Sequence, residues 1–357
     1  MADNKPPGFW ATLKKDWQST PIRASLRRNF QELKAFYLTR EQQDRLENMN
    51  WLKRWLFTGT WLLKILFFKL SPFRRLLLVA SLYMLLAQNG NGGRDLTIFG
   101  AITILLLLLL ELKDKLLAHS ELADGRKVQL ALAPEANPRV PGWEIWLFTR
   151  SANDVGGDLV DILQLTDKCH GLALGDVAGK GLKAALFMAK LQATLRALAS
   201  DFDDLGLFAK KVNRIFNRDG LPNSFASLIY LCVESNSPSV RLVNAGHMPP
   251  LLLHNGTVRE LDKGGRALGL VADSDYREER LSLEPGATLF LYSDGLTEAQ
   301  NEEGAFFGDE RMIALLKRCG ELSPSETGRQ FINAVDGFVG EARPADDLSL
   351  IILRRNA

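Results

Sequence analysis

The chain has 357 residues, enough for two ordinary domains, and 46% of them are apolar, which excludes a wholly disordered protein. Its 44 Lys and Arg nearly balance 42 Asp and Glu, and a net charge of +2 alone argues against a nucleic-acid-binding protein. The average hides two regions of opposite sign. Residues 1–75 hold 15 basic and 6 acidic residues, and residues 76–357 hold 29 and 36. We therefore expect a basic front and an acidic body with separate roles.

The front of the chain, residues 1–73, is predicted to be a basic amphipathic region that faces a membrane. Its later part, Trp51–Leu70, interleaves Trp and Phe with Lys and Arg, a mixture that suits the headgroup zone of an anionic leaflet. A basic, aromatic surface that binds nucleic acid is the competing interpretation. We favour the membrane, and expect no nucleic-acid partner, because this segment directly precedes two apolar runs.

Residues 74–112 are predicted to form a two-helix transmembrane hairpin. Leu76–Gln88 and Leu96–Leu110 contain no charged residue, and a turn rich in Gly and Asn separates them. Each run is shorter than the ~20 residues that cross a bilayer, although flanking residues can extend it. Lys and Arg lie on the outer flanks, so the positive-inside rule places both ends of the hairpin in the cytoplasm. The alternative is a soluble protein in which the hairpin is the core of a dimer.

Residues 113–140 are predicted to contain a linker helix. Its leucines form an uneven apolar stripe that is broken once, at Gly125, and three prolines from Pro134 to Pro141 then end the helix and mark a boundary. The stripe is too short for a regular coiled coil. A helix that leaves a membrane hairpin can still pair two protomers, so a homodimer through this linker is one of the two states that we expect. The other state is a monomer.

The acidic body, residues 141–357, is predicted to be an α+β domain. Strands outnumber helices and follow one another in runs, which favours stacked sheets over an alternating βα pattern. The expected strands are Trp143–Phe148, Leu159–Leu165, Leu172–Leu174, Phe225–Val233, Val240–Val243, Pro250–Leu253, Thr288–Tyr292 and Leu348–Leu353. The expected helices are Lys180–Ser200, Asp203–Phe216, Glu310–Lys317 and Ser325–Val339.

Four short segments of the body place an Asp beside Gly or at the edge of an expected strand. They are Asp154–Asp158 (DVGGD), Gly175–Gly181 (GDVAGKG), Ser293–Glu298 (SDGLTE) and Asp346–Ser349 (DDLS). Carboxylates that converge at one sheet edge repel each other and stay ionised only around cations. Oxygen ligands without His or Cys favour Mg²⁺ or Mn²⁺ over zinc. One such Asp is more often a turn or a helix cap, and only the four together indicate a metal site.

Six motifs follow one another in the body: DVGGD, GDVAGKG, Asn244–Pro250 (NAGHMPP), Leu291–Ala299 (LYSDGLTEA), Phe307–Arg311 (FGDER) and DDLSL. In this order they resemble the motifs of the metal-dependent protein phosphatases of type 2C (PPM), and most closely of their bacterial SpoIIE/RsbU branch. The likeness runs from about Leu130 to Arg354. It implies a four-layer α-β-β-α sandwich, here preceded by the helical membrane hairpin and the linker helix. It also implies removal of phosphate from phosphoserine or phosphothreonine in proteins with two Mn²⁺ or Mg²⁺ ions.

The resemblance assigns roles to the carboxylates of these motifs. It makes Asp176 the ligand that bridges both metals, followed by the backbone carbonyl of Val177. Asp158 supplies a further carboxylate, partly through water, and Asp294 binds the second metal. These three Asp form the implied catalytic set, in which a hydroxide bridging two ions attacks phosphorus in line. In the last motif the ligand is Asp346.

Three further residues have two interpretations each. Asp347 can share the ligand role with its neighbour. His247 is interpreted as a loop histidine bonded to backbone, with a proton donor as the alternative. Lys180 is interpreted as a solvated residue at a helix start, with a phosphate contact as the alternative. Eukaryotic relatives carry a His just after the bridging Asp and this chain does not, so the general acid stays unassigned.

We therefore predict a multi-pass protein of the bacterial inner membrane, with a cytoplasmic N-terminus and a cytoplasmic serine/threonine protein phosphatase domain. The resemblance implies a phosphorylated protein as substrate, and an anti-sigma-factor antagonist of the STAS type is the candidate. The alternative function is a catalytically silent, phosphatase-like scaffold that docks a partner. All four carboxylate positions are filled, which favours the enzyme.

Overall fold

The computed structural model describes residues 45–46, 49–86, 96–220 and 224–356. Most of the predicted amphipathic front, residues 1–44, and the predicted hairpin turn lie outside these ranges. The chain divides into two compact units, Met1–Leu116 and Leu117–Ala357.

The first unit consists of helices where the structure describes it. These are α4 (Trp51–Lys69), α5 (Pro72–Leu86) and the beginning of α6 (Leu96–Leu132). Helices α5 and α6 run antiparallel and approach closely, since a Cβ atom on Gly100 would lie 2.8 Å from the carbonyl oxygen of Ser81. Farther along the pair, Arg74 forms ion pairs with Glu111 at 2.6 Å and with Asp114 at 2.7 Å. The two apolar runs therefore form paired helices.

One described helix, α6, is long and apolar enough to cross a membrane. Helix α5 has 15 residues, about 22 Å at 1.5 Å per residue, which is less than the ~30 Å of a hydrocarbon core. A hairpin that crosses the membrane twice is thus not confirmed. The expected linker is not a separate helix either, because α6 continues without interruption from Leu96 through Gly125 to Leu132. A single Gly inside a helix costs only about 1 kcal/mol and need not break it.

Two five-stranded antiparallel sheets form the centre of the second unit. The first sheet has the strand order β1-β10-β9-β6-β7, and the second has the order β2-β3-β4-β5-β8. The strands are β1 (Trp143–Arg150), β2 (Asp158–Gln164), β3 (Cys169–Val177), β4 (Ala226–Glu234), β5 (Ser239–Ala245), β6 (Leu251–His254), β7 (Thr257–Glu260), β8 (Glu279–Ser282), β9 (Thr288–Tyr292) and β10 (Leu348–Arg355).

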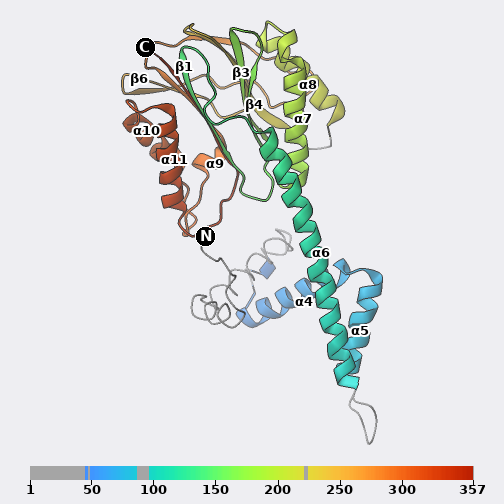
Figure 1. Ribbon diagram of the computed structural model, residues 1–357. Coiled ribbons are helices and arrows are strands. Elements are labelled where there is room, and N and C mark those ends of the chain that lie inside the picture. Colours follow the sequence, from blue (N-terminus) through green and yellow to red (C-terminus); the bar gives the residue numbers. More distant parts are fainter. Residues whose placement is uncertain (1–44, 47–48, 87–95, 221–223, 357) are drawn as a thin grey trace, which may run out of the picture. The chain divides into compact units, whose positions relative to one another are not determined.

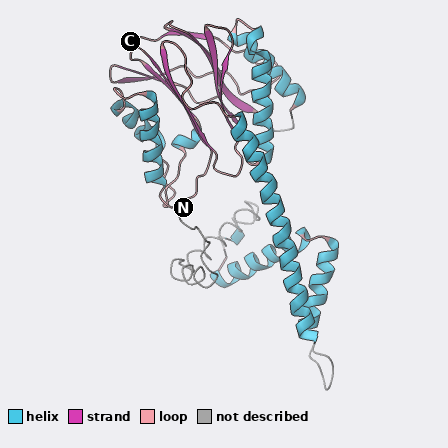
Figure 2. Ribbon diagram, in the orientation of Figure 1, coloured by secondary structure: helices cyan, strands magenta, loops and turns pink. Residues whose placement is uncertain are grey.

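Helices cover the outer face of each sheet (Figure 1). Helices α7 (Leu182–Leu198) and α8 (Leu205–Asp219) lie on the second sheet. Helices α10 (Gly308–Arg318) and α11 (Pro324–Val339) lie on the first. A short helix, α9 (Asp294–Thr297), and a 3-10 turn, η1 (Ala199–Asp201), complete the second unit. The layer order is therefore helix, sheet, sheet, helix, which confirms the α+β class with two antiparallel sheets (Figure 2).

Three apolar layers hold this sandwich together. On β10, Leu350 and Ile352 face the helices of the first sheet, whereas Ile351 and Leu353 face the space between the sheets. Strand β4 alternates in the same way between α7 and α8 on one side and the first sheet on the other. Strands buried on both faces are apolar at every position, and this explains why the sequence shows apolar runs here instead of alternation.

All eight expected strands and all four expected helices of the body are present, and all but Thr288–Tyr292 have shifted ends. Strand β3 is three times as long as its expected core, Leu172–Leu174, because it pairs with neighbours on both sides, β2 and β4. The sequence reasoning missed β7, β8 and α9. Each has four residues, and the two strands are polar and partly exposed, so their pairing comes from the sheet and not from an apolar pattern.

Candidate metal centre

The motif carboxylates lie at one end of both sheets. Asp158 is the first residue of β2 and stands directly opposite Asp176 on β3. Asp294 begins α9 just after β9, and Asp346 lies two residues before β10. The amide of Gly157 donates a hydrogen bond of 2.6 Å to the carboxylate of Asp347, and this bond joins the two sheets at this end.

The carboxylates raise one another's pKa. Burial, followed by the charge of Asp294 and then of Asp346 and Asp347, raises the pKa of Asp176 to about 7. Burial and the charge of Asp176 raise the pKa of Asp158 well above its ordinary value. Burial and the charge of Asp346 also raise the pKa of Asp294. Such mutual repulsion is relieved when a cation binds between the groups.

One oxygen of Asp158 points to the same conclusion. Its Oδ2 atom is buried and has no hydrogen-bond partner among the residues that the structure describes. A buried carboxylate oxygen without a partner is costly, and a bound cation is one way to satisfy it. The candidate metal ligands are oxygen atoms, which Mg²⁺ and Mn²⁺ prefer. No three His, Cys, Asp or Glu side chains of the described chain form a ready-made metal cage, so the ligand assignment stays a prediction.

Asp347 has a role in building the site. Its Oδ1 atom accepts a hydrogen bond from the amide of Ala152 at 2.7 Å. Its Oδ2 atom accepts from Gly157 at 2.6 Å and from Asp158 at 3.4 Å. Asp347 is buried, whereas Asp346 is partly exposed. Backbone amides thus engage both oxygens of Asp347, and this favours Asp346 as the ligand of the pair.

Lys180 and Val177 lie on either side of the Gly179 turn that follows β3. The ammonium group of Lys180 is 3.0 Å from Asp346 and donates a hydrogen bond of 2.6 Å to the carbonyl of Ala345. The backbone amide of Val177 donates to the carbonyl of Gly157 at 3.4 Å. Lys180 therefore lies beside the acidic cluster as a cation, and no contact tests whether it binds phosphate.

His247 is buried and bonded on both sides of its ring. Its Nε2 atom lies 3.2 Å from the carbonyl oxygen of Tyr292, which can only accept, and its Nδ1 atom lies 2.7 Å from the hydroxyl of Ser227. The ring is therefore assigned the tautomer with a proton on Nε2. Burial lowers the pKa of His247 to about 4, so the ring is neutral at neutral pH. These contacts favour the structural interpretation over the proton donor.

Two residues near the site were missed by the sequence reasoning. Gln129, on α6, makes two hydrogen bonds to Gly156 in the DVGGD turn. Arg150, at the end of β1, makes a two-fold hydrogen bond to Asp336 of α11 at 2.7 and 3.1 Å. No local motif surrounds either residue, so nothing in the sequence could have singled them out.

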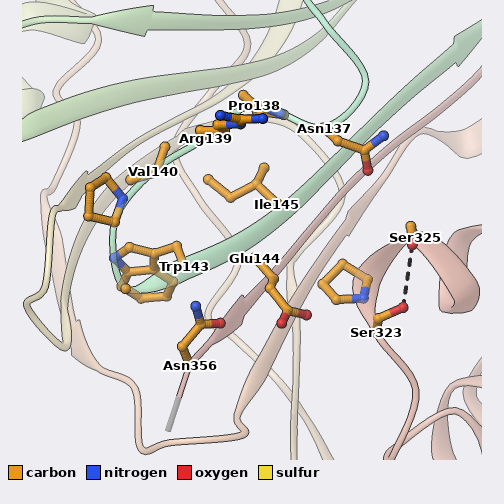
Figure 3. A pocket seen from close by; sticks show the side chains of 13 residues that line it. Asn137, Pro138, Arg139, Val140, Trp143, Glu144, Ile145, Ser323, Ser325 and Asn356 are labelled. Atoms are coloured by element: carbon orange, nitrogen blue, oxygen red, sulfur yellow. Dashed lines mark hydrogen bonds between the residues drawn. The ribbon is translucent and has the colours of Figure 1, made fainter.

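Arg150 also lines a cavity of about 370 Å³ that reaches Asp346. A cavity of about 620 Å³ opens elsewhere, around Trp143, Glu144 and the hydrogen-bonded pair Ser323 and Ser325 (Figure 3). Trp143 and Arg150 are the two ends of β1, about 23 Å apart at 3.3 Å per residue. Of these two cavities, the smaller one adjoins Asp346, and it leaves room there for a substrate side chain.

Comparisons with known proteins agree with this geometry. The family model described as "Stage II sporulation protein E (SpoIIE)" matches residues 166–356. The chain is 26% identical to the phosphoserine phosphatase RsbU of Bacillus subtilis over 240 residues, which cover 66% of this chain and 70% of RsbU. It is 25% identical to protein IcfG of Synechocystis sp. over 311 residues, which cover 77% of this chain and 48% of IcfG. It thus spans about half the length of IcfG.

Solved structures show the same fold. The PP2C domain of SiaA from Pseudomonas aeruginosa matches with a TM-score of 0.58 and 22% identity, covering 68% of this chain and 99% of that domain. A structure of the RsbU and RsbW domains of a Mycobacterium tuberculosis protein matches with a TM-score of 0.52 and 26% identity, covering 62% of each chain. The sheet order, the carboxylates at one end and a family model that covers more than half of the sequence lead to one assignment: the chain belongs to the SpoIIE family and carries its PP2C-type phosphatase domain.

Proposed function

We propose that the protein is a metal-dependent protein serine/threonine phosphatase that acts on a phosphorylated protein. The proposal depends on the cluster of Asp158, Asp176 and Asp294. Burial and the charges of neighbouring carboxylates raise the pKa of each of these residues. Ionised carboxylates at that density need cations, and a PP2C-type fold surrounds them. The relative RsbU is named a phosphoserine phosphatase, which favours phosphoserine as the substrate group.

The chain's own residues would hold two Mn²⁺ or Mg²⁺ ions. Asp158, Asp176, Asp294 and Asp346 would hold them with carboxylate oxygens, together with the backbone carbonyl of Val177. Bound ions of this class activate water and neutralise charge on a transferred phosphoryl group. The cavity of about 370 Å³ beside Asp346 would admit the phosphorylated side chain.

Hydrolysis of a phosphoserine peptide by the full chain tests the assignment. We expect turnover that requires Mn²⁺ or Mg²⁺ and falls about 100-fold or more in Asp176→Asn and in Asp294→Asn. Asp262→Asn is the matched control, because Asp262 is exposed on a loop and lies outside the motifs. Full activity in both site variants would overturn the metal assignment. Binding of a phosphoprotein without any turnover would favour the silent scaffold.

We also propose that the protein is anchored in the bacterial inner membrane as a multi-pass protein, with its N-terminus and phosphatase domain cytoplasmic. Leu105, Leu108 and Leu109 of α6 are each more than half exposed. An apolar helix face of this kind is unfavourable in water. The close approach of α5 and α6 at Gly100 supports a hairpin. Fusion of a reporter that works only outside the cytoplasm, placed after residue 91, should be active, and the same fusion after residue 357 should be inactive.

The proposed partners are a phosphorylated STAS-type protein and a second copy of this chain. The first follows from the SpoIIE/RsbU resemblance, and release of phosphate from such a protein, compared with a peptide of the same phosphosite, tests it. The second rests on exposed apolar residues of α6, Leu112 and Leu116. Light scattering of the detergent-solubilised full chain should give the mass of a dimer, and Leu116→Glu should give that of a monomer.

A further inference from the structure

The last turns of α6 are bonded directly to the loop that leads into the candidate metal centre. Gln129 donates a hydrogen bond from Nε2 to the carbonyl of Gly156 at 2.8 Å, and its Oε1 atom accepts one from the amide of the same glycine at 3.1 Å. One side-chain amide thus satisfies both backbone groups of a single residue. This geometry fixes the position and also the orientation of that peptide segment.

The bonded glycine is two residues before a predicted metal ligand. Gly157 lies between Gly156 and Asp158, and its amide donates a hydrogen bond of 2.6 Å to Asp347. The turn is therefore held from two directions, by α6 at Gly156 and by Asp347 at the next two amides. A Cβ atom on Gly156 would overlap the hydroxyl of Ser151 and would lie 2.6 Å from Oδ2 of Asp347, so any side chain there would displace these groups.

Within the described parts of the chain, few other polar contacts attach this end of α6 to the domain. Gln192 of α7 donates to the carbonyl of Leu132 at 3.1 Å, and His119 lies 3.4 Å from Asp154 in a largely exposed pair. A cavity of about 220 Å³ opens under the helix, and Gln129, Gln192 and Asp158 are among its lining residues. The helix is therefore not packed tightly against the carboxylate of Asp158. His119 reaches the first residue of the DVGGD turn, and Gln129 bonds to the backbone of that turn next to Asp158.

We propose that Gln129 is a positioning residue that couples α6 to the predicted metal ligand Asp158. Its amide holds Gly156, and through Gly157 it sets where the carboxylate of Asp158 lies. Loss of the two Gln129 bonds should therefore change how well Mn²⁺ binds. The inference rests on the proposed function, because it takes Asp158 as a ligand. Partners that orient ligands from outside the coordination sphere typically change metal affinity by 10- to 100-fold.

Hydrogen exchange and Mn²⁺ affinity of the full chain test this role. Gln129→Met keeps the length of the side chain and removes both hydrogen bonds. We expect faster exchange in a peptide covering residues 152–160 of the metal-free protein and a roughly tenfold weaker Mn²⁺ affinity. Gln129→Glu keeps an acceptor for the amide of Gly156 but loses the donor to its carbonyl, so intermediate exchange is expected.

Gln192→Met is the matched control, because it frees the end of α6 without touching Gly156. Unchanged exchange and unchanged Mn²⁺ affinity in Gln129→Met, with the protein still folded, would overturn the proposal. An equal effect of Gln192→Met would also overturn it, because general loosening of α6 would then be the cause. The exchange measurement needs neither metal nor substrate, so a wild-type chain without phosphatase activity would refute the proposed function and leave this test valid.

Discussion

At the scale of single residues, the second unit buries ionisable groups in positions that disfavour their charged forms. Asp176 and Asp158 are carboxylates with raised pKa values, and His247 is a histidine with a lowered one. The two carboxylates share one cause, because each is buried beside other carboxylates. Burial is the largest cause in all three groups, and for His247 it outweighs the hydrogen bond to the carbonyl of Tyr292, which raises the pKa. These causes lead to stability effects of opposite dependence on pH.

Asp176→Asn should stabilise the metal-free protein at pH 8. The folded-state pKa of about 7 lies above the unfolded value of 3.8, so the folded state holds the proton more tightly and loses stability as pH rises through that window. Removing the charge should recover on the order of 3 kcal/mol. Urea unfolding with a chelator measures this. Mn²⁺ should stabilise the wild type and not the variant. A metal-free variant that is less stable than the wild type would contradict the repulsion.

His247 should make the fold sensitive to acid. Its folded-state pKa of about 4 lies below the unfolded 6.5, so the unfolded state binds the proton more tightly, and stability falls as pH drops from 6.5 to 4. The loss should approach about 3 kcal/mol. The carboxylates titrate in the opposite sense, so the useful quantity is the difference in unfolding free energy between wild type and His247→Gln. That difference should shrink toward pH 4, and a constant difference would speak against a neutral buried ring.

At the scale of elements, short pieces of structure between strands hold the carboxylates in place. Helix α9 has four residues, and it places Asp294 at its first position directly after β9. The next residue, Gly295, faces the backbone of Asp347, where a Cβ atom would overlap the carbonyl oxygen. The loop before β10 and the start of α9 are therefore in contact because one residue has no side chain.

Gly295→Ala should separate these two segments. The added methyl group should cost about 1–3 kcal/mol of unfolding free energy through overpacking, and it should lower phosphatase activity by moving Asp294 away from the other carboxylates. Gly337→Ala in α11 is the matched control, because a Cβ atom there would meet nothing within 4 Å. That control should be neutral or more stable by up to about 1 kcal/mol, from helix propensity. Thermal unfolding of both variants tests this. An equal change of unfolding free energy in the two variants would show that the close contact at Gly295 does not exclude a side chain.

At the scale of the whole molecule, the charge difference between the two ends of the sequence corresponds to two different kinds of structure. The basic front leads into helices with exposed apolar faces. The acidic body is the sandwich with its carboxylate cluster. An anionic membrane surface and divalent cations would each neutralise one half of the chain.

Membrane fractionation should retain the full chain in the pellet after carbonate extraction. Leu105→Arg combined with Leu109→Arg should release it, because each Arg at the centre of a spanning helix costs about 2.5–3.5 kcal/mol. Val128→Arg changes an equally exposed apolar residue of α6 beyond the apolar run and should leave the protein in the membrane. Release of the wild type itself would favour the soluble alternative.

The amino-acid sequence by itself determined the class of the second unit, and it predicts the residues of the candidate site. Apolar runs buried on two faces identified the strands, and Asp beside Gly at strand ends identified the carboxylates. Both are local patterns, because they depend on which side chains can be buried and on where the backbone can turn.

Only the tertiary structure decided the relations between distant segments. It paired Asp158 with Asp176, and it engaged both oxygens of Asp347 with backbone amides, while Asp346 faced Lys180. It also made the linker part of one long helix and bonded Gln129 to a glycine 27 residues away. No local pattern encodes these contacts, because each depends on two surfaces that meet only when the sandwich closes.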